Sequence, residues 1–178
     1  NDYINTFKVA GLIVVKDDKI LYENYNFGND ETSKWMSFSV TKSVTSMLIG
    51  AAIKDGFIKS VNDPISTYVT DLNQGNYSNV SIEDVLQMSS GIDWNEDYAD
   101  ANSDVNIASA FNDTKLYSYL NKLEVSNKPG TKFNYNTAES NVIGGIVRAA
   151  TGQNLSTYLE KKICCLLYTS DAADEPMR

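Results

Sequence analysis

The stretch FSVTKSVTSMLIGAAIKDG, residues 38–56, places a serine and a lysine three positions apart at the start of a long apolar segment. Apolar residues recur along it at helical spacing, and Gly56 is a typical C-terminal stop. The pattern predicts a helix that begins at Ser39 and is buried on nearly all sides. Because residues three apart share one helix face, Lys42 can place its amine against the Ser39 hydroxyl.

The absence of histidine makes this pair informative. A serine hydroxyl is a poor nucleophile until a base takes its proton, and here that base must be lysine, tyrosine or a carboxylate. A buried lysine amine loses its proton more readily than a solvated one, so we expect Lys42 to be largely buried. Backbone N–H groups at the helix amino end favour a developing oxyanion. Ser39 and Lys42 therefore suit the roles of nucleophile and proton partner.

The Ser-x-x-Lys spacing alone is weak evidence for a nucleophilic serine. With 18 serines and 13 lysines in 178 residues, about one Ser-x-x-Lys is expected by chance, and the chain has one. An ordinary helix start with a solvated lysine is the alternative at this stage. No metal-ligand cluster and no phosphate-binding glycine loop competes in the sequence, so we expect neither a metal nor a cofactor.

The composition is that of a globular protein, with 42% hydrophobic and 21% charged residues. A formal charge of −8 opposes binding to nucleic acid or to an anionic membrane. The apolar runs are far shorter than the roughly 20 residues of a membrane span, so no transmembrane segment is predicted. The sequence starts at Asn1 without a signal-peptide pattern, and we expect that the amino terminus is missing.

Other segments predict a hairpin and further helices. Residues 11–16 and 20–25, GLIVVK and ILYENY, are β-rich runs separated by a short polar turn, which predicts an antiparallel pair. SIEDVLQMSSG, residues 81–91, begins with a capping-box pattern and predicts a short helix. DTKLYSYLNKLE, residues 113–124, and ESNVIGGIVRAATG, residues 139–152, predict two more. No internal repeat is present, which argues against a repeat protein.

The carboxyl end, CCLLYTSDAADEPMR, breaks the helical pattern of residues 154–163. Its run Cys165–Glu175 resembles a translated sequencing adaptor. We therefore interpret residues 164–178 as a non-native tail and residues 1–163 as the natural segment. Both cysteines fall in this tail, so they give no information on a disulfide or on the redox compartment.

Three segments resemble, in order, the penicillin-recognising serine hydrolases, the serine beta-lactamase family. Residues 36–66 resemble the nucleophile helix with its Asp-Pro segment, residues 81–94 the next helix and its Ser-Gly turn, and residues 128–159 the Pro-Gly loop with the catalytic tyrosine. The resemblance spans residues 11–163. It implies the amino-terminal part of a beta-lactamase/DD-peptidase-like fold, classed as α+β (α/β in some schemes), with an antiparallel sheet flanked by helices plus a helical subdomain.

The resemblance also implies residue roles. Ser39 would be the acylated nucleophile, Lys42 its proton partner, and Tyr135 the tyrosine that helps to deprotonate the serine and to protonate the leaving group. Whether Lys42 or Tyr135 is the kinetic base is open. Literal Tyr-x-Asn matches at residues 22–24 and 119–121 compete with Tyr135, but they lie in a predicted strand and a predicted helix.

The residues after Tyr135 depart from the usual pattern, because Thr137 stands where lactamases and peptidases usually carry asparagine. This departure weakens the case for a beta-lactam or peptide substrate and favours the branch resembling 6-aminohexanoate-dimer hydrolases and esterases. GIDWNEDYAD, residues 91–100, also resembles that branch. The resemblance implies that four of its side chains lie near the pocket: Asp93, Trp94, Asp97 and Tyr98. An acidic solvated loop is the alternative; Thr137 and Trp94 are the candidate substrate-binding residues.

The predicted function is a serine hydrolase that acts through an acyl-enzyme on a small ester, amide or beta-lactam. A non-catalytic sensor or scaffold with the same pocket is the alternative, and the motif order speaks against an unrelated Ser-Lys protease. The family's third motif does not follow Tyr135, so we expect this segment alone to be inactive. We also expect it to be poorly soluble, because the hairpin of residues 11–25 would have an unpaired edge and the helix from Ser39 would be partly uncovered. The sequence leaves the oligomeric state and location open, although the resemblance favours an extracytoplasmic one.

Overall fold

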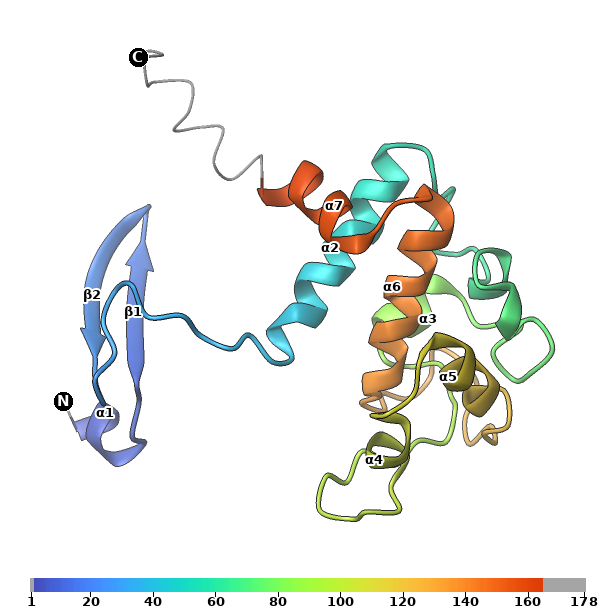
Figure 1. The fold of residues 1–178 in the computed structure, drawn as a ribbon, viewed down its shortest axis with the longest axis horizontal. Coiled ribbons are helices and arrows are strands. Elements are labelled where there is room, and N and C mark those ends of the chain that lie inside the picture. Colours follow the sequence, from blue (N-terminus) through green and yellow to red (C-terminus); the bar gives the residue numbers. More distant parts are fainter. Residues whose placement is uncertain (1, 165–178) are drawn as a thin grey trace. The chain divides into compact units, whose positions relative to one another are not determined.

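The computed structural model describes residues 2–164 and divides the chain into two compact units, Asn1–Phe38 and Ser39–Arg178. The proposed adaptor-like residues 165–178 therefore lie outside the described residues. We call the first the hairpin unit and the second the helical unit, and each is described by itself (Figure 1).

The hairpin unit contains the predicted antiparallel pair. Its elements are α1 (Asp2–Thr6), β1 (Gly11–Lys16) and β2 (Lys19–Tyr25). The strands pair antiparallel, with Gly11 opposite Tyr25. Asp17 and Asp18 form the turn with φ values of 50° and 57°, the left-handed pair that suits the twist of a two-residue hairpin turn. The predicted hairpin is thus confirmed.

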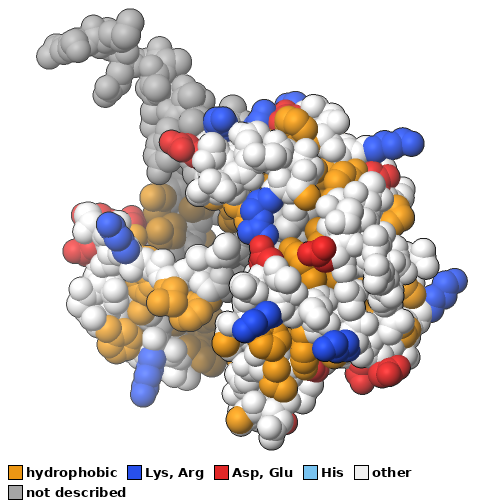
Figure 2. Space-filling view, turned by 45° about the vertical axis from the view of Figure 1, so that its right-hand side comes forward, with side chains coloured by type: hydrophobic (Ala, Val, Ile, Leu, Met, Phe, Trp, Pro, Cys, Tyr) orange, Lys and Arg blue, Asp and Glu red, His pale blue; other side chains and the backbone are white. Residues whose placement is uncertain are grey.

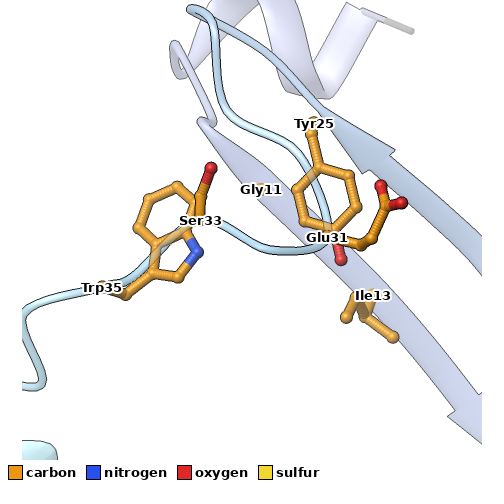
Figure 3. Close-up of a pocket in the computed structure, with 6 residues that line it drawn as sticks. All are labelled: Gly11, Ile13, Tyr25, Glu31, Ser33 and Trp35. Atoms are coloured by element: carbon orange, nitrogen blue, oxygen red, sulfur yellow. The ribbon is translucent and has the colours of Figure 1, made fainter.

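Gly11 allows an aromatic side chain to lie close to the start of β1. A Cβ atom built at this position would come within 3.2 Å of the Trp35 ring and 3.3 Å of the Tyr25 ring. Together with Ile13 these residues line an open hollow on the hairpin unit (Figure 3). A larger residue at position 11 would push the indole off the strand.

The helical unit consists of α-helices joined by loops and short 3-10 turns. Its elements are α2 (Val40–Lys54), η1 (Ile65–Thr67), η2 (Thr70–Leu72), α3 (Ile82–Leu86), α4 (Asp104–Ala108), α5 (Asp113–Leu120), α6 (Thr137–Thr151), α7 (Leu155–Leu159) and the π-helical turn η3 (Glu160–Cys164). The helices predicted near residues 81, 113 and 139 are α3, α5 and α6. The capping box predicted for α3 is formed between Ser81 and Asp84.

Helix α6 is the centre of the helical unit and contacts α2, α3, α4, α5 and α7 (Figure 1). The side chain of Asn136 accepts from the N–H of Glu139 at its amino end, and Gly152 closes its carboxyl end in the left-handed conformation, with φ 67°. Val142 and Ile146 are fully buried in the core. The first turn of α6 is therefore held firmly, and the loop before it has a fixed end.

Helix α2 is less buried than its sequence predicts. Leu48, Ile49 and Ala52 are buried on one side, whereas Val40 and Met47 remain 67% and 57% exposed. Within residues 2–164, the buried side packs mainly on α6, and Ala51 and Ile53 are half-buried against the same core. The expectation of burial on nearly all sides is therefore wrong for the described chain.

The surface offers no extended positive region on the face drawn in Figure 2. Lysine and arginine side chains lie singly among acidic and neutral ones there. This distribution agrees with the formal charge of −8. Across residues 2–164, none of the helices has both the length and the apolar character needed to cross a membrane.

Candidate active site

Ser39 lies at the amino end of α2 and directs its hydroxyl to Lys42. It is the N-cap residue, but its side chain makes no capping hydrogen bond to the helix. The Lys42 amine instead donates to Ser39 Oγ at 3.2 Å, as the three-residue spacing predicts. Ser39 is exposed, so a substrate carbonyl can approach this hydroxyl from solvent.

Tyr135 joins this pair from a loop. It belongs to the irregular segment that precedes α6, and its ring centroid lies 5.4 Å from Lys42 Nζ, within cation–π range. The Lys42 side chain lines a small pocket between α2, α3 and α6 together with Met88 and Ser140. The structure thus brings Ser39, Lys42 and Tyr135 together, with the amine next to both the hydroxyl and the aromatic ring.

Lys42 is half-buried rather than largely buried. The face of α2 that carries Lys42 is only partly covered within residues 2–164, because α2 packs mainly on α6 there. The expected degree of burial is therefore wrong for the described chain, although the expected contact with Ser39 is present.

The competing tyrosines occupy ordinary structural positions. Tyr22 lies on β2, in the hairpin unit. Tyr119 lies on α5 and donates to the carboxylate of Asp104. Burial and this hydrogen bond raise the pKa of Tyr119 to about 12, which keeps it a neutral donor. Tyr135, in contrast, has its ring within cation–π range of Lys42.

The residues on either side of Tyr135 are both anchored. The backbone N–H of Asn134 donates to the Met88 carbonyl at 2.7 Å. Asn136 is 1% exposed, and its amide donates to the Tyr77 hydroxyl at 3.3 Å. Because the loop is fixed before and after Tyr135, the freedom of the phenol is limited to its own side-chain torsions.

Thr137 and Trp94, the candidate substrate-binding residues, meet at a carboxylate that sequence reasoning missed. Glu96 accepts from the Thr137 backbone N–H at 3.0 Å, from the Thr137 hydroxyl, and from Trp94 Nε1 at 2.5 Å. It also accepts from the Tyr98 hydroxyl at 2.6 Å. No periodic spacing links residue 96 to residue 137, so the sequence contains no local signal for this arrangement.

Asp93 and Asp97, the two acidic residues singled out from residues 91–100, lie apart from the Glu96 network. Asp93 and Asp97 are both exposed, and Asp97 Oδ1 accepts from the backbone N–H of Ala99 in a local turn. Of the four side chains named from residues 91–100, Trp94 and Tyr98 therefore approach Thr137 through Glu96. Trp94 is only 5% exposed, so its ring is part of the buried core.

A buried polar cluster lies in the first turn of α6. Glu139 is 1% exposed and accepts from the Tyr77 hydroxyl at 3.1 Å, while its Oε2 has no hydrogen-bond partner within the described chain. Burial raises the pKa of Glu139 to about 7, although hydrogen bonds from Ser90 and Tyr77 oppose this shift. The cluster also contains Asn136, so it supports the loop that carries Tyr135.

Chemically, the arrangement offers a hydroxyl nucleophile, an amine and a phenol. Within residues 2–164, histidine, cysteine, aspartate and glutamate form no group of three or more that could hold a metal ion. The helix amino end at Ser39 adds backbone N–H groups that suit a developing negative charge. These features suit acyl transfer to a serine.

Comparisons with known proteins give similar sequences and similar folds. The chain is 32% identical over 164 residues to a 6-aminohexanoate-dimer hydrolase from Paenarthrobacter ureafaciens, covering 85% of this chain and 41% of that protein. A class C beta-lactamase structure matches with a TM-score of 0.73 and 21% identity, over 93% of this chain and 46% of the other. A D-alanine carboxypeptidase, AmpC, from Burkholderia cenocepacia matches with a TM-score of 0.68 and 20% identity, over 90% and 43%.

The structural matches define the beta-lactamase/DD-peptidase-like fold, here as helices plus a small antiparallel sheet. The Beta-lactamase family model matches residues 5–173. The chain belongs to the beta-lactamase family. It spans less than half the length of each of these three relatives.

Proposed function

We propose that the chain is the amino-terminal part of a serine hydrolase that cleaves a small ester, amide or beta-lactam through an acyl-enzyme. Ser39 is the nucleophile, Lys42 its proton partner and Tyr135 the second proton-transfer group. The observation that carries this proposal is the position of the Lys42 amine, 3.2 Å from Ser39 Oγ and 5.4 Å from the centre of the Tyr135 ring. A non-catalytic sensor would have no need of this arrangement.

The proposed reaction has two halves. The Lys42 and Tyr135 pair accepts the Ser39 proton as Oγ bonds to the substrate carbonyl carbon, and the same pair returns that proton to the leaving amine or alcohol. A water molecule then attacks the acyl-serine, gives its proton to the pair, and releases the acid while Ser39 regains its proton. No group outside this set is needed to balance the protons.

The substrate class follows from Thr137 and from the relatives. A threonine at this position lacks the amide donor that lactamases usually carry there, and its hydroxyl is already bonded to Glu96. A relative named 6-aminohexanoate-dimer hydrolase supports an amide or ester substrate over a beta-lactam. Because the chain covers 41% of that relative, the rest of the pocket would come from the remaining part of the protein.

The test uses the full-length protein that carries this sequence, assayed with p-nitrophenyl esters, 6-aminohexanoate dimer and nitrocefin. We expect turnover of at least one ester or amide, and a loss of about 10³-fold or more in Ser39→Ala. Ser43→Ala is the matched control, since Ser43 is an exposed serine one turn further along α2. Equal turnover by wild type and Ser39→Ala would refute the proposal, and binding without turnover would favour the sensor.

A further inference from the structure

The carboxylate of Glu96 joins two segments that lie about forty residues apart in the chain. Its Oε2 accepts from Trp94 Nε1 and from the Thr137 backbone N–H, and its Oε1 accepts from the hydroxyls of Tyr98 and Thr137. Trp94 and Tyr98 belong to the rim loop, defined here as residues 92–98. Thr137 is the first residue of α6. One side chain thus fixes the rim loop to the start of α6.

These four hydrogen bonds occupy all the acceptor sites of the Glu96 carboxylate. An ionised carboxylate has about four lone-pair sites, and each is used here by a donor from the chain itself. Burial disfavours the charge of Glu96, but the hydrogen bonds from Thr137, Tyr98 and Trp94 outweigh it and hold the pKa of this carboxyl below its usual range. Glu96 therefore stays ionised at neutral pH and has no acceptor site left for a substrate ammonium.

The same rim loop also holds the other side of Tyr135. The side-chain amide of Asn134 donates to the Trp94 carbonyl at 3.2 Å. Thr137 and Asn134 lie two residues after and one residue before Tyr135, so both ends of the short tyrosine loop are tied to the rim loop. Removing Glu96 would cut the tie between Thr137 and the rim loop, and it would leave the Thr137 N–H and the Trp94 indole N–H without the acceptor that they share. The end of the loop would then be held only by Asn136.

We propose that Glu96 is a positioning residue that holds Tyr135 in reach of Lys42 by fixing the rim loop to the first turn of α6. This inference rests on the proposed function, because it assigns Glu96 a role through Tyr135 in the acylation of Ser39. It differs from a substrate-binding role, since every acceptor site of the carboxylate is occupied within the chain.

Two substitutions separate shape from charge. The donors at Oε2 are N–H groups, which can only donate, whereas those at Oε1 are hydroxyls, which can rotate and accept instead. In Glu96→Gln the amide oxygen can replace Oε2 and the NH₂ group can donate to both hydroxyls, so all four contacts survive. Glu96→Ala removes all of them. A positioning role therefore predicts that Gln rescues what Ala loses.

The experiment measures the rate at which a fluorophosphonate labels Ser39 in the full-length protein, with kcat and KM for an ester. We expect Glu96→Ala to slow labelling and kcat by about 10- to 100-fold, the scale of an ångström misplacement, with little change in KM. Glu96→Gln should stay within about threefold of wild type, with an unchanged pH profile. The matched control is Glu124→Ala, a truncation of an exposed glutamate.

A second readout follows the network without activity. The indole ¹H–¹⁵N resonance of Trp94 should move in Glu96→Ala and stay near its wild-type position in Glu96→Gln. If Glu96→Ala does not fold, Thr137→Val removes one of the four contacts and should slow labelling by about 3- to 10-fold.

The inference is overturned if Ser39 is labelled in wild type and is labelled equally fast in folded Glu96→Ala or folded Thr137→Val. It is also overturned if Glu96→Gln does not restore the labelling rate that Glu96→Ala loses. Absence of wild-type labelling would refute the proposed function, and with it the role of Glu96 in acylation, while the indole resonance would still test the network.

Discussion

The buried carboxyl of Glu139 should make the helical unit less stable as the pH rises from about 4.5 to about 7. The side chain is 1% exposed and one of its oxygens has no hydrogen-bond partner within the described chain. Burial raises its pKa to about 7 from an ordinary value of 4.5, against opposing hydrogen bonds from Ser90 and Tyr77. The folded protein therefore holds a proton that the unfolded chain releases.

This difference in proton binding sets the sign and the size of the change in the free energy of unfolding with pH. Below pH 4.5 the carboxyl is protonated in both states, and its contribution to the free energy of unfolding is complete. As the pH rises to about 7 the unfolded state ionises first, so the folded state loses stability relative to it. A shift of about 2.5 pH units at about 1.4 kcal/mol each corresponds to roughly 3 kcal/mol.

Urea unfolding of the full-length protein and of Glu139→Gln, measured between pH 4.5 and 8, tests this reasoning. Glutamine stays neutral, so the free energy of unfolding of wild type minus that of the variant should fall by roughly 3 kcal/mol across this range. Asp55 and Glu96, whose pKa values are lowered, act in the opposite direction but are present in both proteins. A difference that stays flat or rises with pH would refute the reasoning. Glu124→Gln, at an exposed glutamate, is the matched control.

Other substitutions give separate expectations. Lys42→Ala should slow acylation of Ser39 by about 10²- to 10⁴-fold in stopped-flow assays with an ester, without changing the thermal midpoint by more than a few degrees. Tyr135→Phe should reduce kcat on a similar scale and alter its pH profile, and an unchanged profile would argue against proton transfer by the phenol. Gly91→Ala should cost about 2 kcal/mol or more in chemical denaturation, because Gly91 has φ 81° and an added Cβ would lie 2.0 Å from the Asn127 carbonyl oxygen; a neutral effect would contradict this.

The parts of the fold that sequence reasoning predicted depend on neighbours in the chain. The hairpin turn at Asp17 and Asp18, the capping box at Ser81 and the contact of Lys42 with Ser39 each involve residues within a few positions of one another. Backbone geometry fixes such contacts wherever the rest of the chain lies. For this reason the start of α2 and the contact between Lys42 and Ser39 could be predicted from the amino-acid sequence.

The parts of the fold that sequence reasoning missed depend on contacts between residues far apart in the chain. Glu96 meets Thr137 across 41 positions, and no spacing rule indicates which loop will reach the start of α6. The burial of α2 was overestimated because apolar periodicity shows only which helix faces can be covered, not which faces a partner does cover. Val40 and Met47 stay exposed within the described chain. The short helix α4 was missed as well, although Ser103 is a recognisable N-cap that accepts from the Asn106 N–H.

The most direct test of the account is peptide mapping by mass spectrometry after the full-length protein has reacted with a fluorophosphonate. The account predicts one adduct, on the peptide that contains Ser39, because the Lys42 amine lies 3.2 Å from its hydroxyl. The adduct should disappear in Ser39→Ala and persist in Ser43→Ala. An unlabelled wild-type protein, or an adduct on a different serine, would contradict the assignment of Ser39 as the nucleophile.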